Sequence, residues 1–512
     1  MIRFVPPIFA LVAATTTAVI TAVDAWRTLS LVGFSHLDED VAVYWYAAVE
    51  FAHLRFREPF FYGQAYNHLG EALLAAPLVA MGVPLWIGPV LVSTAIGLAP
   101  WGALALLAWR RGAVGLAVLF LGAPTLMPVG YTILLGKFFG FGLFAVALAM
   151  LAADFARSPG LRLAAGFLAA LGVGVVPNAA LLAVVAVAWM FVSVPHGDRA
   201  GRVRLVVLGL AGGAGVVALG RLFYILRPPW NLHPSPALEF HWTLLVDGMI
   251  HLSRHLGRVT PTVFAHPAVP LLAVAGVAIM AARRYRWEAA APAFSLLAIV
   301  PTALAVGKVH EATPSVFFAY ERMFLGVPLA LGVIALATVG AGLWRGGASA
   351  RSVIIATAVV VAAGLFKQAS LETEVASELR IPQGVLSRVE VVDMRATCDA
   401  VERAARATGA GLAVFLVDRT PAYACGALAY GKLTTIFPSY ERRTWILQEE
   451  AVRPRDALLL VDVDPEAACR RVALLEPGAL CGPVGAEMVV VRYRARSAID
   501  FLRSLGVDVR RF

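Results

Sequence analysis

The sequence predicts a polytopic α-helical membrane protein that ends in a small α/β domain. Of the 512 residues, 60% are hydrophobic and 15% are charged, whereas soluble domains have about 45–50% apolar and about 25% charged residues. The mean hydropathy is +0.77. The apolar residues gather in stretches of about 18–25 residues, the length that crosses a hydrocarbon core of ~30 Å. We therefore expect a transmembrane domain over residues 1–370 and a soluble domain over residues 371–512.

About eleven stretches are long and apolar enough to cross a membrane. The first is longer than the apolar core of a signal peptide and lacks a small-residue cleavage site, so we expect it to remain as a helix. The runs around Pro124, Pro128 and Pro177 are short, which favours broken or re-entrant helices. The expected spans are residues 8–32, 84–108, 113–130, 138–155, 162–176, 177–195, 203–224, 267–282, 288–306, 323–343 and 352–368.

Basic residues predict the orientation of these helices. Cytoplasmic loops carry an excess of Lys and Arg, so the net charge of +10 is a topology signal and does not indicate nucleic-acid binding. An odd number of spans then places the N-terminus inside and everything after about residue 369 outside. The content of Ala, Gly, Val and Arg points to a high-GC bacterium, so we expect the bacterial cytoplasmic (inner) membrane. The loop arginines are Arg110, Arg111, Arg157, Arg162, Arg199, Arg202, Arg204, Arg283, Arg284, Arg286, Arg345 and Arg351, and the expected outer loops are residues 33–83, 131–137, 225–266 and 307–322.

The C-terminal domain has the pattern of an α/β fold with two disulfides. All four cysteines lie in it, and an even number in an extracytoplasmic domain favours disulfides. Because the domain has no CxxC spacing and no histidine, a metal site is the weaker interpretation, and four free buried cysteines are the other alternative. Of three pairings we favour Cys398–Cys425 and Cys469–Cys481. Strand-like runs cover residues 412–417, 457–463 and 488–492, and helical patterns cover residues 397–407, 465–475 and 497–505.

Three consecutive acids directly after the first apolar stretch form the strongest candidate site. Asp38, Glu39 and Asp40 stand at the membrane edge, and an ionisable cluster against a transmembrane helix indicates a functional site. The alternative is a solvated turn that caps the next helix, because Asp is a favoured N-cap residue. Residues 41–57 are expected to form an amphipathic helix on the membrane surface. Glu71 then opens a second apolar segment, where it also suits a helix N-terminus.

The histidines gather on the side that is expected to face outward. Nine of the ten lie in predicted outer segments, and only His196 lies in a cytoplasmic loop. Asp247, His251 and His255 recur every four residues, so a helix would place them on one face. There they are candidate ligands for a divalent metal ion. Ordinary interfacial histidines are the alternative, and no metal ligand or certain cofactor is assigned. The nine histidines are His36, His53, His68, His233, His241, His251, His255, His266 and His310.

Two groups of motifs carry a family resemblance. The first outer loop contains Asp38-Glu39, Tyr62-Gly63-Gln64-Ala65-Tyr66, Glu71-Ala72 and Ala75-Ala76-Pro77-Leu78, and a late span begins with Tyr320-Glu321-Arg322-Met323-Phe324 and continues to Pro328. Over roughly residues 1–370 the chain thus resembles the polyprenyl-phosphate-sugar-dependent glycosyltransferases of the GT-C class, in their protein-mannosyltransferase and aminoarabinose-transferase-like branch. The second match is partial, because Met323 stands where the family has a tyrosine.

The resemblance implies an inverting sugar transfer from a polyprenyl-phosphate donor to an acceptor at the outer face of the membrane. Asp38 is the expected general base, with Glu39 or Asp40 as the orienting or substitute group. Arg322 is expected to bind the donor phosphate, because a guanidinium binds phosphate oxygens bidentately. The secondary candidates for this phosphate are Lys308 and Lys137, and the residues expected along the acceptor loop are His36, Tyr62, Gln64, Tyr66, His68 and Glu71.

Other readings of these residues stay open. Arg322 also fits an interfacial side chain paired with Glu321, and Lys137 fits an interfacial anchor. At the level of function, the alternatives are a polytopic lipid or glycan transporter or flippase, and a non-catalytic cell-envelope scaffold. The chain has no clear internal repeat of the kind that transporters often contain. The expected partners are a lipid-linked sugar donor, membrane lipids and an unknown glycan, lipid or protein acceptor, and no nucleic acid.

Overall fold

The chain folds into two compact units. Unit 1 comprises Met1–Val32, Val90–Leu219 and Pro236–Val385, and unit 2 comprises Gly33–Pro89, Gly220–Ser235 and Leu386–Phe512. The computed structural model describes residues 6–60, 62, 67–155, 158–193, 199–226, 238–257, 260–261, 266, 268–310, 313–316, 320–343, 349–380, 389–438 and 453–507.

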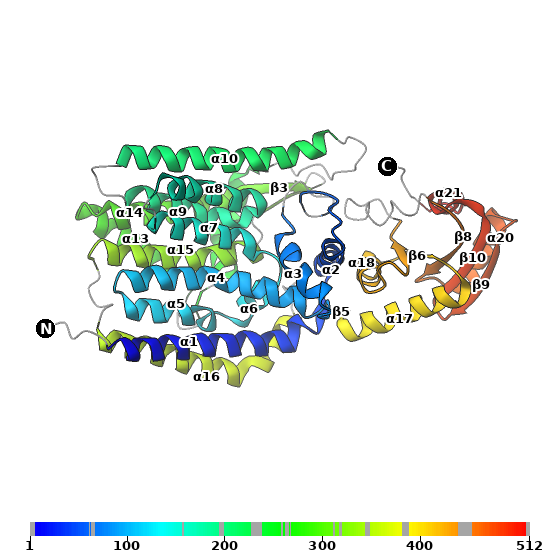
Figure 1. The fold of residues 1–512 in the computed structure, drawn as a ribbon, viewed down its shortest axis with the longest axis horizontal. Coiled ribbons are helices and arrows are strands. Elements are labelled where there is room, and N and C mark those ends of the chain that lie inside the picture. Colours follow the sequence, from blue (N-terminus) through cyan, green and yellow to red (C-terminus); the bar gives the residue numbers. More distant parts are fainter. Residues whose placement is uncertain are drawn as a thin grey trace. The chain divides into compact units, whose positions relative to one another are not determined.

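Unit 1 is built from apolar helices (Figure 1). Among the described residues, five helices are long and apolar enough to cross a membrane, or six when one bent pair is counted as a span. The five are α1 (Pro7–Thr28), α4 (Gly88–Arg110), α10 (Arg199–Ile225), α14 (Trp287–Ala305) and α16 (Ala350–Arg380). The other described helices of unit 1 are α5 (Val114–Leu126), α6 (Val129–Leu135), α7 (Gly140–Asp154), α8 (Pro159–Val175), α9 (Ala180–Val192), α11 (Trp242–Ile250), α12 (Leu252–Leu256), α13 (Val269–Arg283) and α15 (Tyr320–Gly340).

Each of the eleven predicted spans lies on a helix of this set or on two consecutive ones. Over the described residues, and apart from the bent pair, the other predicted spans lie on apolar helical stretches of 10–17 residues, among them Leu325–Gly340 of α15. The chain is therefore a polytopic membrane protein, while the total of eleven crossings stays a prediction.

At two of the three predicted places a helix ends just before a proline, and one of these breaks bends a predicted span. Helices α5 and α6 meet at 96°, and Met127 between them is extended, with φ −83° and ψ 154°. A residue before proline favours this conformation because the ring of Pro128 clashes with a helical predecessor. Val176, before Pro177, is likewise extended and ends α8. Pro124 lies inside α5 and does not break it.

Glycines let two helices of unit 1 approach closely. A Cβ atom on Gly166 of α8 would lie 2.0 Å from the carbonyl oxygen of Val206 in α10, and one on Gly209 would lie 2.1 Å from that of Leu163. Small residues at such contacts bring backbones together, which gives van der Waals packing that apolar lipid cannot replace. The α8–α10 pair is therefore specified by the glycines on both helices.

Two of the predicted outer segments of unit 1 pair with each other. They form a three-stranded sheet in the order β2 (Leu238–Phe240), β3 (Val306–His310) and β4 (Thr313–Val316). Leu238 pairs with Lys308 and Phe240 with Val306, both antiparallel. The two segments therefore lie at the same end of the helices, as the predicted topology requires.

The C-terminal part of unit 2 is a five-stranded mixed sheet (Figure 1). The strand order is β7-β6-β8-β10-β9, with β6 parallel to both of its neighbours and β10 antiparallel to β8 and β9. The elements are β6 (Leu412–Phe415), β7 (Thr434–Ile436), β8 (Pro454–Val461), β9 (Leu480–Gly485), β10 (Met488–Ser497), α17 (Val391–Thr408), α18 (Arg419–Leu428), α20 (Pro465–Leu475) and α21 (Ala498–Ser504).

The first predicted outer loop belongs to the same compact unit as this sheet. It contains β1 (His36–Leu37), α2 (Glu39–Ala52) and α3 (Gly70–Ala80), and β1 pairs antiparallel with β5 (Val389–Glu390) just before α17. The domain boundary expected at residue 370 falls inside α16, which continues to Arg380. The helix continues beyond its apolar stretch because residues 369–380 are rich in Glu, Ala and Leu, which are good helix formers.

Two disulfides join elements of the C-terminal part. Cys398 in α17 pairs with Cys425 in α18, and Cys469 in α20 pairs with Cys481 in β9. These are the pairs that the sequence favours. The first covalently links the two helices that follow β5 and β6.

Candidate active site

Asp38 begins helix α2, directly after β1. Its backbone is extended, with φ −121° and ψ 179°, and its Oδ1 accepts a 2.9 Å hydrogen bond from the Val41 N–H. The capping role that the sequence left open is therefore real. A carboxylate has about four acceptor positions, so one capping bond is compatible with a second role as a proton acceptor.

The other two acids occupy the first turn of α2. The positive end of the helix dipole favours negative charge there. Glu39 also forms an ion pair with Arg419, the first residue of α18, and their side chains are only 19% and 24% exposed. The ion pair of Glu39 thus joins α2 to α18 in the C-terminal part of unit 2, and the sequence did not predict this contact. Asp40 is half-buried.

Glu50, near the end of α2, is a fully buried carboxylate. Its Oε2 accepts a hydrogen bond from Tyr62 at 3.0 Å, and its Oε1 accepts bonds from Tyr430 and from Arg57 Nε, each at 3.2 Å. Burial raises the pKa of Glu50, and the charge of Arg57 and the hydrogen bond from Tyr62 partly oppose this rise. The sequence places Glu50 on an amphipathic helix but gives no sign that it is a buried centre.

Aromatic rings surround this carboxylate. The Tyr46 ring meets the rings of Tyr62, Tyr423 and Tyr430 edge-on, at centroid distances of 6.5, 5.9 and 5.9 Å. Such arrangements bring the positive edge of one ring to the negative face of the next. Burial raises the pKa of both Tyr62 and Tyr430, so both phenols stay protonated and donate to Glu50. Tyr62, which the sequence places along an acceptor loop, is a member of this network.

The remaining described acceptor-loop candidates lie in β1 and around the start of α3. His36 lies in β1 with its Nδ1 2.9 Å from the Ser35 hydroxyl. Burial lowers the pKa of His68, which precedes α3. Glu71 lies in the first turn of α3 with no exposed surface, as expected for an acid at a helix N-terminus. Gln64 and Tyr66 lie outside the described residues.

The cations expected to bind a donor phosphate all belong to unit 1, whereas the acids belong to unit 2. Lys137 follows α6. Lys308 lies in β3, and Arg322 lies in the first turn of α15. The side chains of Lys308 and Arg322 lie outside the described residues.

A buried ion pair in unit 1 was not predicted from the sequence. Lys367 Nζ in α16 lies 2.8 Å from Asp24 Oδ2 in α1 and 3.3 Å from the Thr132 hydroxyl in α6. The Gln368 amide donates to Asp24 Oδ1 at 3.1 Å. The Asp24 and Lys367 side chains are 2% and 6% exposed. The sequence contains a sign of this pair, because each of the two charged residues lies within a predicted apolar span.

The helical stack of metal ligands expected around His251 is not continuous. Helix α11 ends at Ile250 and α12 begins at Leu252, with His251 between them. Its Nδ1 lies 3.2 Å from Asp247 Oδ1, and both side chains are more than half exposed. The His255 side chain lies outside the described residues. Among the described residues, no group of three or more acidic, His or Cys side chains has the geometry of a metal site.

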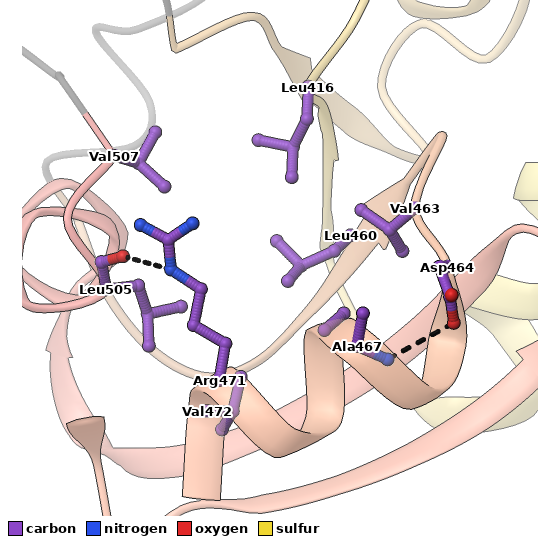
Figure 2. Close-up of a pocket in the computed structure, with 10 residues that line it drawn as sticks. Leu416, Leu460, Val463, Asp464, Ala467, Arg471, Val472, Leu505 and Val507 are labelled. Atoms are coloured by element: carbon purple, nitrogen blue, oxygen red, sulfur yellow. Dashed lines mark hydrogen bonds between the residues drawn. The ribbon is translucent and has the colours of Figure 1, made fainter. Parts of the chain in front are cut away.

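A cavity of about 230 Å³ opens beside α20 at the carboxyl ends of β6 and β8 (Figure 2). Its walls are mostly aliphatic, and Arg471 Nε donates to the Leu505 carbonyl at 3.0 Å. Asp464 caps α20. Ligands of α/β folds often bind at this edge of a sheet, but Arg471 is exposed to solvent and the cavity contains no buried polar group that would select a ligand.

Comparison with known proteins supports the fold. The structure is similar to the crystal structure of ArnT from Cupriavidus metallidurans bound to undecaprenyl phosphate, with a TM-score of 0.51, over 93% of this chain and 97% of that chain. This chain has a GT-C fold. The sequences are 12% identical, so the similarity concerns the fold alone. No protein-family model and no curated protein matches the sequence.

Proposed function

We propose that this chain is a membrane glycosyltransferase that moves a sugar from a polyprenyl-phosphate donor to an acceptor at the outer face of the cytoplasmic membrane. The observation that carries the proposal is the half-buried Asp38 carboxylate at the start of α2, directly after the first membrane helix of a GT-C fold. The bound undecaprenyl phosphate of the similar ArnT structure supports a polyprenyl phosphate as the lipid carrier.

In the proposed reaction, an acceptor hydroxyl attacks the anomeric carbon of the donor sugar. The Asp38 carboxylate takes the hydroxyl proton as the new C–O bond forms. The bond between the anomeric carbon and the phosphate oxygen breaks, and polyprenyl phosphate leaves with the electron pair. Attack opposite the leaving group inverts the anomeric configuration. Arg322, with Lys308 and Lys137, would stabilise the charge of the leaving phosphate.

The capping role of Asp38 makes a sharp test available. Asn and Ser cap helices about as well as Asp, so D38N and D38S keep the start of α2 but remove the base. General-base catalysis contributes about 10²–10⁴-fold, and we expect a loss of that size in both variants with unchanged melting temperature. The measurement is mass spectrometry of glycolipids and glycans from cells that lack the protein and are complemented with each variant.

Two controls interpret the result. E466Q changes an acid in α20 whose side chain is 84% exposed, and it should retain the transfer, because this acid lies outside the proposed catalytic cluster. Binding of undecaprenyl phosphate, compared with undecaprenol, tests the carrier without knowledge of the sugar. Wild-type transfer by D38N would eliminate Asp38 as the base. An unchanged glycan profile in cells that lack the protein, together with lipid movement by the purified protein, would favour a transporter.

A further inference from the structure

The residues before Asp38 are bonded to the C-terminal part of unit 2. His36 and Leu37 pair with Glu390 and Val389, and the Val391 N–H donates to the Ser35 carbonyl at 2.8 Å. Leu37 has no exposed surface. Because β5 runs directly into α17, the backbone on the N-terminal side of Asp38 is fixed to the start of that helix.

The residue after Asp38 is fixed to the next helix. The Glu39 carboxylate pairs with the Arg419 guanidinium, and both groups are about four-fifths buried. Arg419 is itself placed by a cap, since Asp418 accepts a 2.9 Å hydrogen bond from the Thr420 N–H and thereby starts α18. Asp38 thus lies between Leu37, which pairs with the strand that leads into α17, and Glu39, which forms an ion pair with α18.

The far end of α2 is tied to the same region. Tyr430, which follows α18, donates to Glu50. Gly426 lets α18 pack closely on both β7 and α2, because a Cβ atom there would lie 2.5 Å from the Thr435 hydroxyl and 3.2 Å from Tyr46 Cε2. The Cys398–Cys425 disulfide joins α17 to α18. One cross-linked pair of helices therefore holds α2 at both ends.

We propose that this pair of C-terminal helices positions the base, and that Arg419 and Tyr430 are positioning residues for Asp38. The inference rests on the proposed function. The C-terminal part of the chain then acts within the catalytic centre without touching the substrate. The physical reason is that a displacement of about 1 Å of a catalytic group can reduce a rate by about a hundredfold.

The test compares R419Q with R470Q. Arg470 forms an exposed ion pair with Glu466 in α20, with side chains 71% and 84% exposed, so R470Q makes the same chemical change in the same part of unit 2. We expect R419Q to lower kcat by about tenfold to a hundredfold with KM for the lipid-linked donor changed by less than about twofold. Hydrogen exchange in residues 38–45 should become faster in R419Q and stay unchanged in R470Q.

Exchanging the charges of Glu39 and Arg419 tests whether Arg419 acts through the ion pair or acts directly in catalysis. R419E should lose activity, and the double variant E39R/R419E should regain part of it, because the ion pair is restored with reversed polarity. A loss of kcat in R419Q without faster exchange would overturn the proposal, as would wild-type kcat and exchange. If cells that lack the protein keep an unchanged glycan profile, the proposed function fails, while the exchange difference between R419Q and R470Q still decides whether the C-terminal helices hold α2.

Discussion

Two buried carboxylates, one in each unit, are stabilised by different partners. Asp24 lies within a membrane-spanning helix and faces one ammonium group, that of Lys367, with an amide at its second oxygen. Glu50 lies outside the spans and accepts hydrogen bonds from one guanidinium and two phenols. A carboxylate among membrane helices has no water to replace a lost partner, whereas several donors share the charge of Glu50. We therefore expect Asp24 to be far more sensitive than Glu50 to loss of one partner.

The largest effect is expected for K367M. The substitution leaves the Asp24 carboxylate buried without its counter-charge, and breaking a buried ion pair from one side costs about 3–5 kcal/mol. The measurement is the thermal unfolding of the purified protein in detergent. The double variant D24L/K367M should regain most of the lost stability, since a well-packed apolar pair often replaces a buried ion pair at little cost. Equal melting temperatures for K367M and the wild type would remove the contrast between the two carboxylates.

A smaller effect is expected for Y62F, and a still smaller one for Y430F. Tyr62 is fully buried and donates to Glu50 Oε2, so its loss should cost about 1.5–3 kcal/mol, the usual value of a hydrogen bond to a charged group. Tyr430 is partly exposed and shares Oε1 with Arg57, which keeps its bond in Y430F. Chemical unfolding followed by tyrosine fluorescence gives both values. Y285F, at a side chain that is 83% exposed, is the matched control, and a larger loss in Y430F than in Y62F would reverse the ranking.

The smallest expected effect is a pH dependence from Glu50. Burial raises its pKa in the folded protein, so the folded state holds this proton more tightly than the unfolded state. Stability is then greatest below the unfolded pKa of about 4.3 and falls as pH rises toward the folded value, above which the penalty is constant. The melting temperature of the wild type minus that of E50Q should therefore decrease as the pH rises from the unfolded to the folded pKa of Glu50. His68 has a lowered pKa and the opposite trend, but it is present in both proteins and cancels in the difference.

The sequence predicts the features that depend on local chemistry. Apolar length locates the helices, and the restriction before Pro128 and Pro177 locates their breaks. The capping preference of Asp predicts the start of α2 at Asp38 as one of its two readings. These features need no knowledge of the rest of the chain, because each follows from a residue and its immediate neighbours.

The contacts around α2 could not be predicted in this way. Glu50 and Tyr430 are 380 residues apart, and only the tertiary fold brings a tyrosine after α18 to an acid at the end of α2. Arg419 is one of many arginines in a basic chain, and nothing local distinguishes it from Arg470. The Asp24–Lys367 pair could have been predicted, because a lone charge within an apolar span is visible in the sequence and indicates a partner of opposite charge nearby.

Helix α2 is far from α17 and α18 in the sequence, and this distance has a consequence for biosynthesis. Tyr430 follows Glu50 by 380 residues, which the ribosome takes roughly 20–80 s to translate at about 5–20 residues per second. Throughout that interval the loop that carries Asp38 has been made, but the helices that hold it have not. The contacts around α2 are therefore among the last of the protein to form, only after α17 and α18 have emerged and their cysteines have been joined.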